Sequence, residues 1–310
     1  MDWTNRVGRR LRLKDLHTLQ TVAEAGSMAK ASQHLALSQP AISKAVSDME
    51  HTLGVALLDR SARGVELTEQ GHVLVARTRI IFDEMQQGIK EIEHLADPTQ
   101  GEVRIGTIEP GAAVLSEIIC RLTRRYPRIA YQVTVGDTDM LVRKLRERAL
   151  DLMLTRWNAL SRADDLAAEN LYQSTLVIVA DKSHPLMARK RLILADLMEE
   201  QWALAPPDTF LGRVVAELFG RKKLPLPPSI VTTTSTLMRL NLMASGRFLS
   251  VLPMTVLRHR SYKAWLRRLN VDLGDRPAPI AAITIKDRRS TGAVKLFLQE
   301  SGAICRNLDR

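Results

Sequence analysis

The stretch that decides the N-terminal fold is SQPAISKAVSDMEHTLG, residues 38–54. Its apolar side chains recur at the spacing of one α-helical face, at Ile42, Val46, Met49 and Leu53. Proline is tolerated only in a first helical turn, so Pro40 places the helix start near Gln39, with Ser38 as its N-cap. The exposed side then carries Ser43 and Lys44, which suit a polar partner.

The sequence around this helix predicts a helix-turn-helix with a wing. Upstream, the apolar residues of 13–25 have helical spacing, and the segment ends on Gly26. Residues 28–35 predict a second short helix, separated from the helix that starts near Gln39 by a turn of about three residues. Downstream, VALLDRSARGVELT (residues 55–68) has two short apolar pieces around a basic, glycine-containing tip. This pattern predicts a β-hairpin.

Residues 68–96 contain no proline and predict one long helix. An apolar stripe runs along it, at Leu74, Ile81, Met85, Ile89, Ile92 and Leu95. We expect this stripe to meet a partner helix, because little else in the first 97 residues could cover it. Packing on its own domain is the alternative.

A break at DPTQGE, residues 97–102, separates this part from an α/β half. Short β-rich runs follow at 103–108, 131–135, 151–155, 175–180, 229–234, 248–253 and 280–285, with helical stretches such as 111–125 and 138–149 between them. The alternation predicts an α/β fold with mostly parallel strands.

Composition fits a soluble globular protein of two or three cores, with 45% hydrophobic residues and a net charge of +11. No apolar run reaches the roughly 18 residues of a membrane span, so we expect a cytoplasmic protein with no membrane partner. The net charge does not show which end of the chain would bind a nucleic acid, because residues 1–97 hold 12 Lys and Arg against 13 Asp and Glu. A local cluster of cations at residues 6–14 is better support for a nucleic-acid partner.

The sequence shows no arrangement that supports catalysis or metal binding. It lacks GxSxG, HExxH and a glycine-rich phosphate loop, and its seven histidines have no paired ligand spacing. Cys120 and Cys305 stand far apart, and we expect both to pack in cores, an exposed redox thiol being the alternative. We therefore expect no enzyme, no cofactor and no metal.

In this order, the pieces resemble the LysR-type transcriptional regulators over essentially the whole chain. The resemblance is carried by LHTLQTVAEAGSMAKASQHLALSQPAISKAVSDMEHTLGVALLDRSARGVELTEQG (residues 16–71) and by DKSHPLMARKRLILADL (residues 181–197). It implies a winged helix-turn-helix DNA-binding domain (1–68), a linker and dimerisation helix (69–97) and a regulatory domain (98–310). The last would resemble a periplasmic binding protein, with lobe one at 102–173 and 274–310, lobe two at 174–273, and a small effector between them.

The resemblance assigns the helix at residues 39–53 to the DNA major groove. The candidate DNA contacts are Ser38, Gln39, Pro40, Ser43 and Lys44 on the helix, and Arg60 and Arg63 on the hairpin. Gln39 can pair with adenine and Lys44 with guanine or phosphate, whereas the hairpin arginines would hold phosphates or the minor groove. Family members often carry arginine where Lys44 stands, and lysine lacks the planar fork for bidentate guanine contacts.

Effector candidates lie at strand ends and helix starts, where clefts form in such folds. They are Thr107, Ile108, Glu109, Asp137, Thr138, Arg156, Thr209 and Ser235. Each hydroxyl or carboxylate could instead cap a helix. Glu109 and Arg156 in one pocket would suit a polyhydroxylated or zwitterionic ligand rather than a simple dicarboxylate. The regulatory half resembles the galactose-binding-protein regulators, which implies a sugar or sugar acid; an aromatic or other organic acid stays open.

We therefore expect an effector-gated regulator that binds a double-stranded DNA operator, self-associates to a dimer or homotetramer and contacts RNA polymerase. Two alternatives remain. An enzyme with a DNA-binding head would need the catalytic constellation that is absent above. An architectural DNA binder would bind no ligand.

Overall fold

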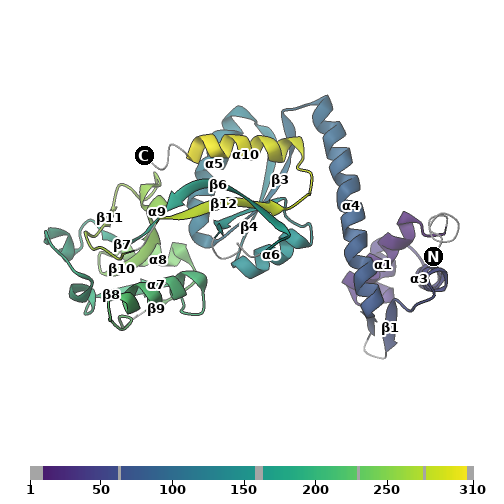
Figure 1. The fold of residues 1–310 in the computed structure, drawn as a ribbon, viewed down its shortest axis with the longest axis horizontal. Coiled ribbons are helices and arrows are strands. Elements are labelled where there is room, and N and C mark those ends of the chain that lie inside the picture. The colour runs from purple at the N-terminus through teal and green to yellow at the C-terminus, as the bar shows by residue number, and fades with distance from the viewer. Residues whose placement is uncertain (1–9, 62–63, 158–162, 229–230, 275–276, 306–310) are drawn as a thin grey trace. The chain divides into compact units, whose positions relative to one another are not determined.

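The computed structural model describes residues 10–61, 64–157, 163–228, 231–274 and 277–305 (Figure 1). Contacts between Cα atoms divide the chain into two compact units, one ending at Ile89 and the other beginning at Lys90. The division falls inside one long helix.

The first unit is a helix-turn-helix with a hairpin. It contains α1 (Leu13–Ala25), α2 (Met28–Leu35), α3 (Gln39–Leu53), β1 (Leu58–Ser61), β2 (Gly64–Leu67) and the first part of α4 (Glu69–Ala96). Helix α3 begins as predicted, since the Ser38 hydroxyl accepts the Ala41 N–H at 3.4 Å and Pro40 lies in the first turn. It ends at Gly54, whose φ of 72° is left-handed and suits glycine.

One carboxylate ties α3 to the hairpin. Oε1 of Glu50 accepts the backbone N–H of Leu57 at 2.8 Å and that of Leu58 at 3.2 Å. Helix α4 closes on the same segment, because a Cβ at Gly71 would lie 2.1 Å from the Leu57 carbonyl oxygen. Helix α3 and the hairpin are therefore fixed relative to each other around the buried Ile42 and its neighbours.

Helix α4 presents the predicted apolar stripe to solvent in the single chain. Its exposed apolar side chains are Val73, Ile81, Met85, Ile89, Ile92 and Leu95, the last exposed by 83%. Leu74 departs from the prediction, because it packs against the core of the first unit. Polar Thr78, Asp83 and Gln87 are buried on the helix instead.

Among the residues that the structure describes, every helix is too short or too polar to span a lipid bilayer.

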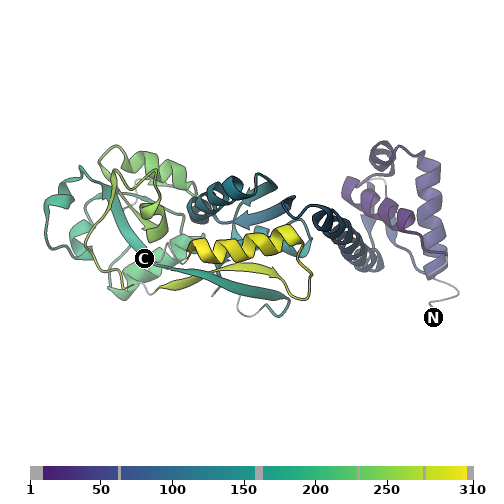
Figure 2. The same cartoon turned by 90° about the horizontal axis from the view of Figure 1, so that it is seen from above.

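Lobe one of the second unit is built on a five-stranded sheet in the order β4-β3-β5-β12-β6. Figures 1 and 2 show the C-terminal helix, in yellow, lying along this sheet. The elements of this lobe are β3 (Gln100–Thr107), η2 (Glu109–Gly111), α5 (Ala112–Arg125), β4 (Arg128–Val135), α6 (Thr138–Arg146), β5 (Leu152–Arg156), β6 (Leu166–Ser174), β12 (Ala278–Ile285) and α10 (Gly292–Cys305). Alternate strand residues face opposite cores: Ile280 and Ala282 pack with α5 and α10, and Ala281 and Ile283 with α6.

Lobe two is a second five-stranded sheet, in the order β11-β7-β10-β8-β9. Its elements are β7 (Leu176–Asp181), η4 (Pro185–Ala188), η5 (Leu194–Leu197), β8 (Gln201–Leu204), α7 (Phe210–Arg221), β9 (Val231–Thr232), α8 (Thr236–Met243), β10 (Phe248–Pro253), α9 (Met254–Arg258) and β11 (Leu266–Arg268). Buried Trp202 donates its indole N–H to the Leu197 carbonyl at 2.9 Å and meets Phe219 edge to face.

The strand directions correct the prediction of a mostly parallel sheet. Strand β12 is antiparallel to both neighbours, and β7 is antiparallel to β10 and β11, so both sheets are mixed. The reason is that the chain crosses between the lobes twice. The two crossings lie side by side, because Ala278 pairs with Ser174 and Pro279 with Gln173 in the β12–β6 ladder.

A buried ion pair stabilises lobe one. Asp151, 6% exposed, accepts two guanidinium hydrogen bonds from Arg104 at 2.7 and 3.3 Å, and one from Arg288 at 3.2 Å. Burial alone would raise the pKa of Asp151, but the hydrogen bonds and charge of Arg104, with the charge of Arg288, hold that pKa below 3.8. This carboxylate is therefore ionised in the folded protein at neutral pH.

The cysteine prediction is half wrong. Cys305 is buried at the end of α10, but Cys120 is exposed. On α5 the buried positions are Val114, Leu115, Ile118 and Leu122. The side chain of Cys120 falls outside that buried face, because successive helical residues are turned by about 100°.

Candidate functional sites

The N-terminal end of α3 offers polar side chains to solvent. Ser38, Gln39, Pro40 and Lys44 are exposed, and Ser43 is half-buried. The apolar face of the same helix is fully buried at Ile42 and Val46, so the helix cannot turn its polar side inward. Arg63 lies outside the described residues, as does the side chain of Arg60.

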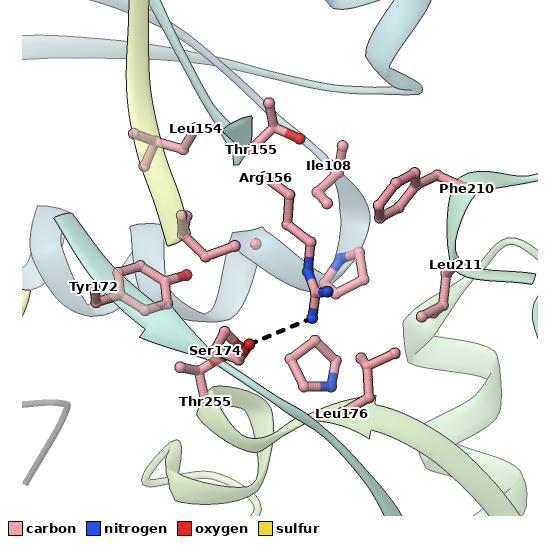
Figure 3. A pocket seen from close by; sticks show the side chains of 14 residues that line it. Ile108, Leu154, Thr155, Arg156, Tyr172, Ser174, Leu176, Phe210, Leu211 and Thr255 are labelled. Carbon is pink, nitrogen blue, oxygen red and sulfur yellow. Dashed lines mark hydrogen bonds between the residues drawn. The ribbon is translucent and has the colours of Figure 1, made fainter. Parts of the chain in front are cut away.

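A cavity of about 40 Å³ lies between the two lobes (Figure 3). Its lining comes from strand ends and loops of both lobes: Ile108, Pro110, Gly111, Leu154, Thr155, Arg156, Tyr172, Ser174, Leu176, Phe210, Leu211, Pro253, Thr255 and Ile280. Most of these side chains are apolar. Hydroxyl groups and one guanidinium group supply the polarity.

Arg156 is the cation in this lining. It ends β5, and its Nη2 donates to the Ser174 carbonyl oxygen at 3.5 Å, across the point where the chain leaves lobe one. Figure 3 shows the guanidinium group between the labelled strand-end residues of lobe one and Phe210 and Leu211 of lobe two. A cation at the junction of both lobes can bind an anion that touches both.

Of the eight predicted effector residues, Ile108 and Arg156 line the cavity and six do not. Three of the six are helix caps. Asp137 accepts the Met140 N–H at 2.8 Å, Thr209 that of Gly212 at 3.1 Å, and Ser235 that of Met238 at 3.2 Å; Thr138 lies beside the first cap, in the first turn of α6. These side chains satisfy free N–H groups at helix starts, so the cap alternative describes them.

The other two residues, Thr107 and Glu109, do not belong to the cavity lining. Thr107 is fully buried, and its hydroxyl lies 3.4 Å from the Leu154 carbonyl oxygen. Glu109 begins the 3-10 turn whose Pro110 and Gly111 line the cavity, but its carboxylate is not part of the lining. Its charge acts instead on buried Arg239 of α8. The predicted pairing of Glu109 with Arg156 is not found in the lining of this cavity.

Arg239 is an unpredicted buried cation in lobe two. It is 1% exposed and donates to the Val251 carbonyl oxygen at 3.3 Å and to the Thr236 hydroxyl at 2.9 Å, while its Nε–H has no partner among the described residues. Burial lowers the pKa of Arg239 to about 10, and the charge of Glu109 opposes this shift. The side chain stays protonated at neutral pH.

The cavity lining contains residues that the sequence pattern did not indicate. Tyr172 and Ser174 lie on β6, a strand that was not predicted, and Phe210 and Leu211 open α7. The sequence did contain a signal for Phe210 and Leu211. Thr209 marks the start of α7, and these two apolar residues follow it directly.

Comparison with known proteins identifies the family. The family description "Bacterial regulatory helix-turn-helix protein, lysR family" matches residues 13–72, and "LysR substrate binding domain" matches residues 96–305. The chain is 30% identical over 244 residues to the HTH-type transcriptional regulator GbpR of Azospirillum brasilense, covering 78% of this chain and 71% of that protein.

Solved structures share the fold. The LysR family transcriptional regulator CbnR has a TM-score of 0.63 at 22% identity, covering 97% of this chain and 100% of CbnR. The regulatory domain of Synechocystis PCC6803 CcmR in complex with 2-PG has a TM-score of 0.57 at 18% identity, covering 67% of this chain and 99% of that one.

The chain belongs to the LysR-type transcriptional regulators. It is a DNA-binding regulator with an effector-binding domain, and its relatives are regulators and not enzymes.

Proposed function

We propose that this regulator reads its operator with the N-terminal end of α3 and senses an organic acid in the cleft between the lobes. In the DNA half, Gln39 and Lys44 would contact base edges, with Ser38, Pro40 and Ser43 beside them. Their exposure on a helix whose opposite face is buried supports this assignment. Arg60 and Arg63 would hold phosphates.

The lining of the cavity is the observation that supports an organic acid over a sugar. A sugar needs hydrogen-bonding partners around its ring, whereas most side chains here are apolar, among them Leu154, Phe210 and Leu211. Arg156 offers a charged fork to one carboxylate. The polyhydroxylated or zwitterionic ligand expected from the sequence depended on Glu109, which is not among the residues that line the cavity.

The cavity must open to admit such an effector. Its volume of about 40 Å³ is far below the roughly 300–1,000 Å³ of typical ligand pockets. Binding would therefore hold the lobes further apart, or move the Arg156 and Phe210 side chains. Effector binding of this kind shifts the balance between two arrangements of the lobes.

The exposed stripe of α4 would pair with the same stripe of a second copy, giving a dimer and, through the regulatory halves, a tetramer. An assembly of this kind would bend the operator, act in the cytoplasm where the DNA lies, and engage RNA polymerase from the bent site. The six exposed apolar side chains of α4 support the pairing.

A thermal-shift titration of the full chain tests the effector class. Aromatic acids, aliphatic acids, sugar acids and neutral sugars are added in turn, because a ligand that binds only the folded state raises the melting temperature. We expect a saturable rise with one class of acid, abolished in Arg156→Gln and kept in Arg143→Gln, an exposed arginine on α6 outside the cavity lining. A neutral sugar whose shift survives Arg156→Gln would contradict the proposal.

A further inference from the structure

The net charge of this DNA-binding protein lies mostly in lobe two. Residues 174–273 hold 15 Lys and Arg against 7 Asp and Glu, a net charge of +8 out of +11, while residues 1–97 carry −1. Within lobe two, residues 218–271 contain ten Lys and Arg and no Asp or Glu. This acid-free segment runs from α7 to β11 and makes lobe two the most positively charged part of the chain.

Part of this segment forms an exposed surface that we call the basic band. It consists of the exposed cations around α9 and β11, namely Lys182, Arg258, Arg260, Lys263, Arg267 and Arg268. Pairing of β11 with β7 places Arg267 opposite Ala180, and the Lys182 N–H donates to the Trp265 carbonyl oxygen at 2.8 Å. The sheet edge thus brings Lys182 beside a segment some 80 residues away in sequence.

The backbone of the basic band is well supported. The Lys263 N–H donates to the His259 carbonyl oxygen at 3.0 Å, and Nη1 of Arg267 donates to the Lys263 carbonyl oxygen at 2.6 Å. Tyr262 and Trp265 meet at right angles, 6.3 Å apart, and pack against the core of lobe two. The cations therefore project from a fixed frame.

The cations of the band differ in whether an acidic group lies close to them. Asp181 lies next to Lys182, and its charge interacts with those of Lys182 and Arg267. By contrast, the side chains of Arg260, Lys263 and Arg268 have no hydrogen bond or ion pair within the described part of the chain. Three exposed cations are available to an external anion.

The surroundings of the band favour a phosphate backbone over a protein partner. The core of a protein interface is apolar and poor in charged residues. Among the described residues after Met238, no large apolar side chain is exposed. Binding to nucleic-acid phosphates needs cations and no apolar centre, and it releases counterions.

We propose that the basic band of lobe two binds backbone phosphates of the DNA duplex that flanks the operator. The contact adds affinity without sequence preference, because phosphates carry no base information. It also places the regulatory half in direct contact with DNA, so that a movement of lobe two changes the path of the flanking DNA. The inference uses the DNA-binding activity that family membership establishes and does not depend on the effector class.

The test compares two neutralised variants of the full chain. Arg260→Gln/Lys263→Gln/Arg268→Gln removes three cations from the band. The control Arg124→Gln/Arg143→Gln/Lys295→Gln removes three exposed cations from lobe one, with the same change in net charge. The operator sequence is the one that the wild-type protein selects from a random library. Two duplexes are prepared, one with this sequence alone and one extended by arbitrary flanks. Binding of each protein to each duplex is measured by fluorescence anisotropy at several salt concentrations.

For wild type, we expect a steeper salt dependence on the extended duplex than on the short one. Each lost phosphate contact lowers the slope of log K against log salt by about 0.9, so the band variant should lose up to about 2.7 per bound protomer on the extended duplex only. The control variant should match wild type. Equal slopes for band variant and wild type on both duplexes would overturn the proposal, and so would an equal loss in both variants.

A second readout separates DNA from an acidic protein partner. RNA polymerase holoenzyme is added to the extended duplex with each variant, and its retention is measured. Loss of polymerase retention in the band variant, with an unchanged salt slope for DNA, would assign the band to a protein and overturn the phosphate proposal. Circular dichroism of both variants checks that the exposed substitutions leave the fold intact.

Discussion

Comparing Asp151→Asn with Asp165→Asn separates the effect of burial on the strength of an ion pair from the effect of its geometry. Lobe one contains two bidentate Arg–Asp pairs of similar geometry. Arg104 reaches Asp151 at 2.7 and 3.3 Å, and Arg146 reaches Asp165 at 2.7 and 2.9 Å. The side chain of Asp151 is 5% exposed and that of Asp165 is 48% exposed.

Asp151→Asn should lower the free energy of unfolding several-fold more than Asp165→Asn. Asp151→Asn leaves Arg104 facing a neutral amide, along with Arg288, whose side chain is 4% exposed. Removing one partner of a buried pair costs about 3–5 kcal/mol, whereas an exposed pair contributes about 0–1 kcal/mol after solvent screening. For a unit of this size, Asp151→Asn should lower the melting temperature by about 6–20 °C, and Asp165→Asn by less than about 4 °C.

Tryptophan fluorescence follows this melt, because Trp157 packs against the core of lobe one. The pH dependence gives a second check. The pKa of Asp151 is lowered by folding, so its stabilising contribution is complete above the ordinary value of 3.8 and disappears as pH falls through the lower folded-state pKa. The gap between wild type and Asp151→Asn should be constant from about pH 5 upward and shrink in acid. Equal losses of melting temperature for Asp151→Asn and Asp165→Asn at neutral pH would refute this reasoning.

Three further substitutions probe the other parts of the chain. Gln39→Ala should relax base preference at one operator position by about 1–3 kcal/mol, and a base-substitution scan that is unchanged at every position would remove Gln39 from base recognition. Ile81→Gln places an amide on the exposed stripe of α4 and should lower self-association; sedimentation velocity identical to wild type would take this residue out of the interface. Gly212→Ala brings a Cβ to 1.9 Å of the Pro206 carbonyl oxygen and should destabilise the start of α7, while Gly220→Ala, with nothing within 4 Å, should stabilise the same helix by up to about 1 kcal/mol in chemical denaturation. The same sign for both glycine substitutions would contradict that account.

Local signals in the sequence were enough for the first unit. The start of α3 depends on Ser38 and Pro40, and its end on Gly54, all within or next to the helix. Its buried face follows from the spacing of Ile42, Val46 and Met49. The hairpin is equally local, because its strands pair across a short tip.

The regulatory half depends on contacts between distant segments, and there the prediction was incomplete. The sequence of β12 does not show that it lies antiparallel between β5 and β6, which precede it by more than 100 residues. Strand β6 reads LAAENLYQS, with too few alternating apolar residues to stand out. Its Tyr172 and Ser174 were therefore missed as cavity residues.

The polar candidates show why residue type alone did not define the cleft. A threonine, serine or aspartate before a helix can cap that helix or bind a ligand, and Thr209, Ser235 and Asp137 form caps. Arg156 lines the cavity from the end of β5, because strand ends face the cleft. Arg239 gave no signal, since an arginine within a helix usually points to water.

The position of β12 also sets an order for folding during synthesis. Lobe two is one continuous piece of chain, whereas the sheet of lobe one keeps a gap between β5 and β6 until residues 278–285 have left the ribosome. Nascent lobe one therefore exposes two unpaired strand edges for the whole time that lobe two is being made. The lobe encoded second finishes first, and the emerging β12 then closes the sheet of the lobe that was begun before it.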